Sequence, residues 1–183
     1  GDISEKNFII VQALAKQILD LFELRKNIEE YVDEQMKEEA PNISAILGTA
    51  VGARILAHAG SLKRLATMPA STIQILGAEK ALFRSLKTGS NPPKHGILYQ
   101  HAIVHASPRW QRGKIARAVA AKAAIAARVD VFKGGLNEML LDKLNVRVKE
   151  IGDKYKEPVI KESKPQPKTK RKKSGRFMKR KRK

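Results

Sequence analysis

The chain has 183 residues, room for one ordinary domain with extensions, and 42% of them are hydrophobic, which is enough for a packed core. The absence of cysteine excludes disulfide scaffolds, thiolate metal sites and cysteine nucleophiles, and no run of 18 apolar residues predicts a membrane span. Lysine and arginine number 37 against 18 acidic residues, for a net charge of +19.

This charge is divided unevenly along the chain. Residues 1–40 carry −5, residues 41–128 carry +12, residues 129–160 are neutral and residues 161–183 carry +12. Glu79 is the single carboxylate of the second block. A folded segment with so few counter-charges of its own implies an external polyanion, with nucleic acid the leading candidate and an anionic membrane surface the weaker one.

Residues 3–39 contain no glycine or proline and predict one long helix, which Pro41 stops. At 1.5 Å per residue this helix reaches roughly 55 Å, more than a domain of about 100 residues can cover. Its apolar residues alternate in steps of three and four, the heptad pattern of a coiled coil. This seam consists of Val11, Leu14, Ile18, Leu21, Ile28 and Val32. We predict a coiled-coil arm that pairs with another chain or a preceding helix; an amphipathic helix lying on the domain is the alternative.

The remaining elements are short, and the chain is predicted to be all-α. We expect one helix over 42–59, capped by Asn42 and ended by Gly60. Residues 71–75 are the only β-like stretch and cannot make a sheet alone. The other expected helices span 61–68, 79–86, 108–132 and 136–155, with a proline-containing loop over 89–96.

The end of the chain is a basic tail. Residues 161–183 contain 13 lysines and arginines and few apolar side chains. Such a composition buries too little surface to offset the conformational entropy of folding, so we predict disorder after Pro158.

No constellation for catalysis is present. The single carboxylate of residues 41–128 excludes paired carboxylates there, and Gly-x-Ser-x-Gly, Walker and Gly-x-Gly-x-x-Gly motifs are absent. His101 and His105 share a helix face, but without an evident third ligand, packed or surface histidines are favoured over a metal pair. We therefore predict no enzyme, no catalytic residue, no cofactor and no metal site.

The helix expected from Pro108 carries the strongest signal for an anionic ligand. Arg109 and Arg112 fall in its first turn, where free N–H groups and the helix dipole favour an anion. The basic stripe then continues in three- and four-residue steps with Lys114, Arg117, Ala121, Ala124 and Arg128. Its alanines leave room for a phosphate backbone, and no acidic residue occurs from 80 to 129. We favour phosphate binding over a merely solvated face.

Two further motifs are weaker on chemistry alone. In the segment 77–84, Gly-Ala-Glu-Lys-Ala-Leu-Phe-Arg, Lys80 and Arg84 face one side of a helix, and Glu79 is expected to cap N–H groups or orient a basic neighbour. The loop ends on Lys94 and His95, and an imidazole on a stiff loop can stack on an unpaired base. A plain connecting loop is the alternative.

Together these motifs resemble the Nop domain of archaeal and eukaryotic box C/D ribonucleoprotein core scaffold proteins (Nop56/Nop58-like), which a spliceosomal relative shares. The resemblance covers about residues 5–157. It rests on Ala-Pro-Asn-Ile at 40–43, Gly-Ala-Glu-Lys-Ala-Leu-Phe-Arg at 77–84, Pro-Pro-Lys-His-Gly at 92–96, Trp-Gln-Arg-Gly-Lys-Ile-Ala-Arg at 110–117 and Ala-Ala-Arg-Val-Asp at 126–130.

The resemblance implies the second helix of a coiled coil over 1–40, a compact helical Nop domain over 41–157 and a disordered Lys/Arg-rich tail over 158–183. It implies an RNA-binding scaffold that recognises kink-turn guide RNA together with a small ribosomal-like protein, in support of rRNA 2'-O-methylation by fibrillarin. The coiled coil would join a second scaffold copy. The family's N-terminal domain, which holds fibrillarin, has no counterpart here, so we expect a C-terminal fragment. Its location would be cytoplasmic in an archaeal cell and nucleolar in a eukaryote.

By position, the resemblance also implies which residues bind RNA. The implied RNA face consists of Lys80, Arg84, Lys94, His95, Arg109, Gln111, Arg112, Lys114 and Arg117, and the motif consists of Gly77, Ala78, Glu79 and Lys80. The alternative function is a non-specific protein that coats rRNA or DNA, with the tail supplying most of the affinity.

Overall fold

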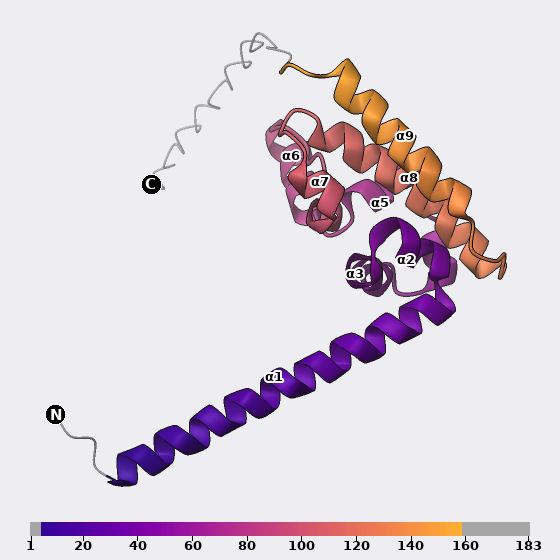
Figure 1. Ribbon diagram of the computed structural model, residues 1–183. Coiled ribbons are helices and arrows are strands. Elements are labelled where there is room, and N and C mark those ends of the chain that lie inside the picture. Colours follow the sequence, from indigo (N-terminus) through magenta and orange to yellow (C-terminus); the bar gives the residue numbers. More distant parts are fainter. Residues whose placement is uncertain (1–4, 159–183) are drawn as a thin grey trace, which may run out of the picture.

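The computed structural model describes residues 5–158, apart from the side chain of Lys6, so the prediction of a disordered tail lies outside the described residues. Residues 5–158 form helices, turns and loops without a strand, which confirms the all-α prediction (Figure 1). No helix in this range is long and apolar enough to cross a membrane.

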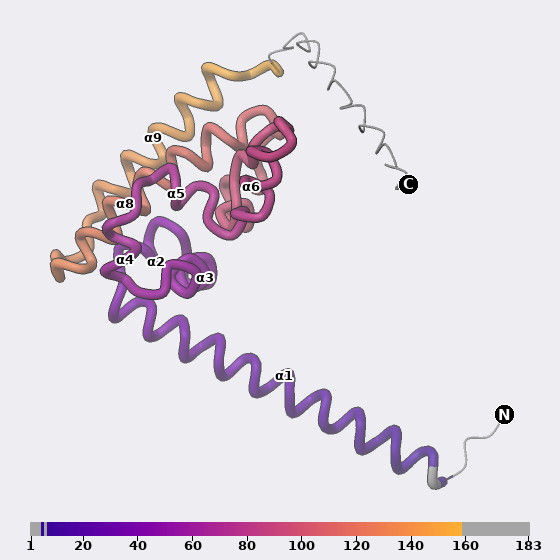
Figure 2. The backbone as a smooth tube through the Cα atoms, turned by 180° about the vertical axis from the view of Figure 1, so that it is seen from behind, coloured from indigo at the N-terminus to yellow at the C-terminus, as the bar shows by residue number. Residues whose placement is uncertain are grey.

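Helix α1 (Glu5–Glu39) is one unbroken helix that extends away from the rest of the chain (Figures 1 and 2). Its 35 residues span about 52 Å. Five of the six seam side chains are exposed, namely Val11, Leu14, Ile18, Leu21 and Ile28. The sixth, Val32, is half-buried against the core. The helix therefore does not lie along the domain, and its apolar seam faces solvent over most of its length.

Only the last turns of α1 are anchored. Met36 is buried against α3 (Thr49–Ala59), where Gly52 leaves room for it: a Cβ at Gly52 would lie 3.0 Å from Met36 Cε. The Ser44 hydroxyl donates to the Met36 carbonyl at 2.8 Å. A Cβ at position 52 would thus require the side chains of Met36 and Ile43 to shift by a few tenths of an ångström.

The expected single helix over 42–59 is wrong, because it is broken at Gly48 into α2 (Pro41–Leu47) and α3. Gly48 has φ 75° and ψ 151°, a backbone conformation that favours glycine and that no helix continues through. The break turns the chain so that both halves bury apolar faces, with Ile43 and Ile55 fully inside.

The β-like stretch at 71–75 is helical, in keeping with the all-α prediction: these residues belong to α5 (Ala70–Ile75), which follows α4 (Leu62–Thr67). Pro69 precedes α5, and its carbonyl accepts the first helical hydrogen bonds. An isolated strand would find no partner here, whereas the helix buries Ile73 against the core. Tertiary packing overrides the β propensity of this stretch.

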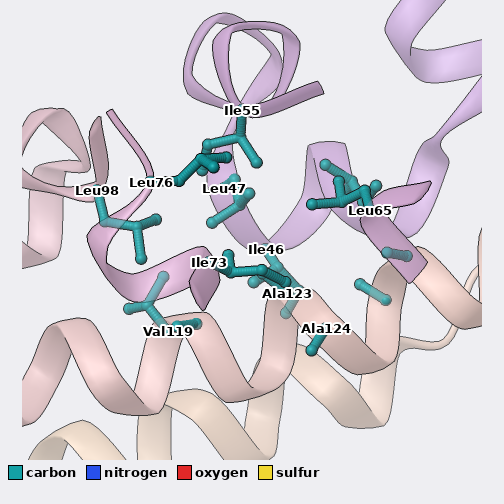
Figure 3. Close-up of a cluster of buried hydrophobic side chains, with 14 of the residues drawn as sticks. Ile46, Leu47, Ile55, Leu65, Ile73, Leu76, Leu98, Val119, Ala123 and Ala124 are labelled. Atoms are coloured by element: carbon teal, nitrogen blue, oxygen red, sulfur yellow. The ribbon is translucent and has the colours of Figure 1, made fainter. Parts of the chain in front are cut away.

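Helix α8 (Arg112–Val131) is the centre of the domain. It packs against α2, α4, α5 and α9 (Glu138–Lys154), with α9 on one side and α5, α6 (Glu79–Thr88) and α7 (Ala102–Ala106) on the other (Figures 1 and 2). Its inward face is mostly alanine, which lets neighbouring helices approach closely (Figure 3). The buried residues of α8 include Ile115, Ala116, Val119, Ala120, Ala123, Ala124, Ala126 and Ala127. The interpretation of Ala124 as open space for a phosphate backbone is therefore wrong.

A buried polar cluster ties α2 to the α8–α9 turn. Both carboxylate oxygens of Asp130 accept hydrogen bonds from the start of α2: Oδ1 from the Asn42 amide N–H at 3.0 Å, and Oδ2 from that of Ile43 at 2.9 Å. The Asn42 side chain donates to Asp130 Oδ1 at 2.7 Å and accepts from the Asn137 N–H at 2.8 Å. Asn42 is thus not the predicted N-cap; Asp130, 88 residues away, fills that role.

We expect Asp130→Ala to lower the free energy of unfolding by about 3 kcal/mol, because it leaves buried N–H groups of α2 without an acceptor. Urea denaturation followed by circular dichroism measures this change. The matched control is Asp153→Ala on the exposed face of α9, which should stay within about 0.5 kcal/mol of the wild type. Equal urea midpoints for the two variants would contradict this role of Asp130.

Candidate nucleic-acid interface

Within the described residues, salt bridges occur in α1 and in α9, and none occurs in the segment that separates these two helices. They join Arg25 to Glu29, Lys26 to Glu30, Asp33 to Lys37 and Arg147 to Glu150. The basic side chains between Pro41 and Val131 are therefore not paired with carboxylates. Such an uncompensated positive surface attracts anions.

Helix α6 presents exposed cations and apolar side chains together. Lys80 and Arg84 are exposed one turn apart, and Phe83 between them is 61% exposed. Ser85 is the one buried residue of this helix. The predicted RNA face omits Phe83, although an aromatic residue flanked by cations in sequence is a recognisable signal for nucleic-acid contact.

The turn before α6 fixes where the helix begins. Gly77 has φ 81° and its N–H donates to Glu79 Oε1 at 2.6 Å. This hydrogen bond from Gly77 and a second from the Glu79 backbone lower the pKa of the Glu79 carboxyl. Glu79 therefore caps N–H groups, one of the two roles expected of it. A Cβ at Gly77 would lie 2.6 Å from Ile97 Cγ1, so the motif sits directly beside the end of the 89–96 loop.

The loop is held against the end of α5 and the residue that follows it, Leu76. Gly96 N–H donates to the Gln74 carbonyl at 3.0 Å, and a Cβ at Gly96 would lie 2.0 Å from the Leu76 carbonyl oxygen, so only glycine fits. The buried Gln74 side chain donates to the Lys94 carbonyl at 2.7 Å. The loop backbone is thus held in place at Lys94 and Gly96, on either side of His95.

His95 is held by an aromatic stack. Its ring lies 4.9 Å from that of Tyr99, with 19° between the planes. Burial lowers the pKa of His95, and the nearby Arg112 and Lys94 charges lower it further. The imidazole is accordingly neutral at pH 7, which suits stacking rather than phosphate binding.

Arg112 does not reach outward as the predicted first-turn cation. Its guanidinium lies 5.3 Å from the centre of the Tyr99 ring and donates to three oxygens: the Ser107 carbonyl at 2.9 Å, the His105 carbonyl at 3.1 Å and the Tyr99 hydroxyl at 3.3 Å. It joins the start of α8 to α7 and supports the ring on which His95 stacks.

The start of α8 differs from the prediction in two other residues. The helix begins at Arg112 rather than Pro108, so Arg109 lies in the preceding turn, where it is exposed. Gln111 is buried, and its side chain donates to the Tyr155 carbonyl at 2.8 Å. Gln111 therefore joins the end of α9 to the start of α8.

The rest of the predicted stripe is divided. Lys114 and Arg117 line a groove between α8 and α9, and the Lys114 ammonium lies 4.0 Å from the centre of the Tyr155 ring. Arg128 donates to the Ala66 carbonyl at 3.1 Å, so it ties α8 to α4. The residues of the basic stripe are evenly spaced in the sequence, but in the fold some line a groove and others hold helices together.

The two histidines of the suggested metal pair have different surroundings. His101 is buried and its Nε2 lies 3.0 Å from the Ile46 carbonyl, while its Nδ1 has no hydrogen-bond partner. His105 is exposed, with its ring edge against Tyr99. One histidine is thus packed in the interior and the other lies at the surface. Residues 5–158 contain no group of three His, Asp or Glu side chains placed to hold a metal ion.

The three motifs meet in one place. Gly77 contacts Ile97 at the end of the loop, and Lys94 lies against Gly113 of α8, where a Cβ would be 3.2 Å from the Lys94 Cβ. Segments 77–84, 92–96 and 110–117 are therefore adjacent, and we call the composite surface of residues 77–84, 92–96 and 109–113 the motif face. It carries cations, an exposed aromatic ring and a stacked neutral imidazole.

Comparisons with known proteins give consistent results. Residues 1–163 match the Nop family model, described as snoRNA binding domain, fibrillarin. An uncharacterised NOP5 family protein of Methanocaldococcus jannaschii is 51% identical over 158 residues, which are 86% of this chain and 38% of that protein. Nucleolar protein 58 of Candida albicans is 50% identical over 131 residues, 72% of this chain and 25% of its own length.

Nucleolar protein 56 of Homo sapiens is 42% identical over 149 residues, which are 81% of this chain and 25% of that protein. The crystal structure of a fibrillarin/Nop5p complex is similar to this fold, with a TM-score of 0.67 and 37% identity, over 82% of this chain and 56% of that one. The chain thus spans between a quarter and two fifths of the length of these curated relatives.

Stability should fall as the pH drops below about 6.5, the ordinary pKa of histidine. Burial lowers the pKa of His101, so near and below that pH the unfolded state binds more protons than the folded state does. Urea unfolding at pH 7.5 and 5.5 measures the loss. A His101→Leu variant should be less stable at both values but show a flatter pH dependence. An unchanged slope in this variant would contradict the assignment to His101.

Arg112→Ala should lower the free energy of unfolding by about 2 kcal/mol, because three oxygens lose their donor. Arg109→Ala, which removes the same charge three residues earlier from an exposed site, should stay within about 0.5 kcal/mol of the wild type. Thermal and urea unfolding of both variants test the difference. If the two arginines proved equally dispensable, the anchoring role of Arg112 would be wrong.

Proposed function

This chain belongs to the Nop family, whose relatives described above are box C/D scaffold proteins, and from this premise we propose that it is the RNA-binding part of such a scaffold. It recognises kink-turn guide RNA together with a small ribosomal-like protein bound to that RNA. The solved structure of the Nop5p relative is a complex with fibrillarin. The full-length protein would hold fibrillarin in support of rRNA 2'-O-methylation.

The observation that carries the proposal is the motif face, in which three separate sequence motifs meet. Lys80, Arg84, Lys94 and Arg109 are exposed cations without a carboxylate partner within the described residues. They supply contacts to phosphates, while His95 extends the Tyr99 stack to an unpaired base. The exposed Phe83 and Leu86 add an apolar surface for a protein that is already bound to the RNA.

The domain division follows the same logic. Residues 1–40 serve as one helix of a coiled coil with a second scaffold copy, residues 41–157 bind the RNA and its protein, and residues 158–183 add sequence-independent attraction. The exposed seam of α1 supports the first assignment, because a row of large apolar side chains in water favours a partner helix. The assembly would be nucleolar in a eukaryote and cytoplasmic in an archaeal cell.

A gel-shift assay on a kink-turn RNA, with and without its small protein partner, tests this function. We expect strong dependence on the partner and little binding to a straight duplex of equal length. Equal binding to both RNAs would favour the coating protein. A chain ending at Ile160 should bind both RNAs more weakly but keep its preference, because a basic tail adds attraction without sequence information.

Lys80→Ala with Arg84→Ala should lower affinity for the partner-bound RNA and reduce the salt slope by roughly 1.4 to 1.8, at 0.7 to 0.9 per lost phosphate contact. The control with the same loss of charge is Lys16→Ala with Lys63→Ala, on α1 and α4. His95→Ala should cost about 1–3 kcal/mol of binding with little change in slope. Identical slopes for the two double variants would remove α6 from the RNA site.

A further inference from the structure

A groove of about 730 Å³ lies between α8 and α9. Helix α9 lies on the side of α8 opposite to α5 and α6 (Figures 1 and 2). Lys114, Arg117 and Lys122 line it from α8, and Lys143 and Arg147 from α9. The side chains of Ala118 and Ala121 on α8 are short and leave the space between these cations open. We call this feature the α8–α9 groove.

We propose that the α8–α9 groove is a second RNA-binding site, which takes the phosphodiester backbone of RNA beyond the part held by the motif face. This inference rests on the proposed function, because it assumes that RNA is already bound nearby. It separates Lys114 and Arg117 from the single site that the sequence predicts.

The charge of the groove fits a polyanion. Five cations line it against two carboxylates, Asp142 and Glu150, and Glu150 is already paired with Arg147 at 2.6 Å. Lys114 and Lys122 are eight residues apart, which is about 12 Å along the helix. A strand of duplex DNA presents one phosphate per roughly 3.4 Å of the duplex axis, so this length can face several phosphates of a nucleic-acid strand.

The chemistry of the lining points to the backbone rather than to the bases. No asparagine or glutamine lines the groove, so the side-chain amides that pair with adenine edges are missing from it. Point charges around a floor of small apolar side chains position a phosphate chain without reading its sequence. The site should therefore raise affinity without raising sequence specificity.

The groove is also continuous with the motif face. Gly113 meets Lys94 of the loop, and the next residue, Lys114, enters the groove. At the same end, the Trp110 indole and the Gln111 amide both donate to the Tyr155 carbonyl, so the two helices are fixed to each other there. Beyond Tyr155 the sequence leads into the segment 161–183, with its charge of +12. One RNA molecule can thus follow basic residues from the motif face into the groove.

The test uses two residues outside the predicted RNA face, Lys122 and Lys143, which line the groove from facing helices. Lys122→Ala with Lys143→Ala should reduce the salt slope for partner-bound kink-turn RNA with a 20-base-pair stem by roughly 1.4 to 1.8. The control with equal charge loss is Lys63→Ala with Lys149→Ala, outside the groove. Circular dichroism checks the helix content of both variants, which alanine should preserve. Equal slopes in the two variants would overturn the proposal.

A second measurement does not depend on charge. Addition of the same RNA to the wild-type chain should shift the NMR methyl signals of Ala118, Ala121 and Val146, which line the groove. Unmoved signals at saturation would overturn the proposal, as would larger shifts with a poly-glutamate peptide, which would assign the groove to an acidic protein. If the wild-type chain showed no preference for the kink-turn RNA, the proposed function would be refuted instead. The salt slopes of the two double variants would still decide whether RNA occupies the groove.

Discussion

The carboxylate of Asp130 joins parts of the chain that are far apart in sequence. It accepts the first N–H groups of α2 and holds the Asn42 side chain, which in turn binds the Asn137 N–H at the entrance to α9. The start of α2, the end of α8 and the start of α9 therefore share one buried cluster. Helix α1 ends at Glu39 and α2 begins at Pro41, so only one residue separates them. The direction of α1 therefore also depends on this cluster.

Positive charge is the second constraint on this fold. The core of α8 is built from alanines, so the helix can be surrounded on several sides while its longer side chains, nearly all cationic, reach the surface. Some of these cations, such as Arg112 and Arg128, donate to backbone carbonyls and so hold helices together. The others are free for a ligand. Sequence spacing does not distinguish the two kinds, because both occur at helical intervals.

The sequence predicts the long elements well. Helices α1, α6 and α9 match their predicted ranges to within a few residues, because their apolar periodicity and flanking glycine or proline residues are local signals. The break at Gly48 and the helical state of 71–75 could not be predicted, because each depends on what the segment packs against. The role of Asn42 was misread for the same reason, since its partner is 88 residues away.

The candidate site shows the same limit. The meeting of segments 77–84, 92–96 and 110–117 follows from the family resemblance and not from any local rule, and the contacts of Gly77 and Gly113 explain it physically. The Gln111 side chain is buried, and the Arg112 guanidinium is held by hydrogen bonds to the protein. The number and spacing of charges in the sequence reveal neither fact. Phe83 was overlooked because an aromatic residue in an amphipathic helix is more often part of the core.

Helix α1 is anchored only by its last turns, so a small change in its angle there displaces its far end by a large distance. A tilt of about 10° at Met36 would move Glu5, about 46 Å away along the helix, by roughly 8 Å. Small adjustments at the contact between Met36 and Gly52 are thus amplified into large displacements of anything that pairs with the seam. The direction of α1 is set at its last turns, where the Met36 side chain lies over Gly52.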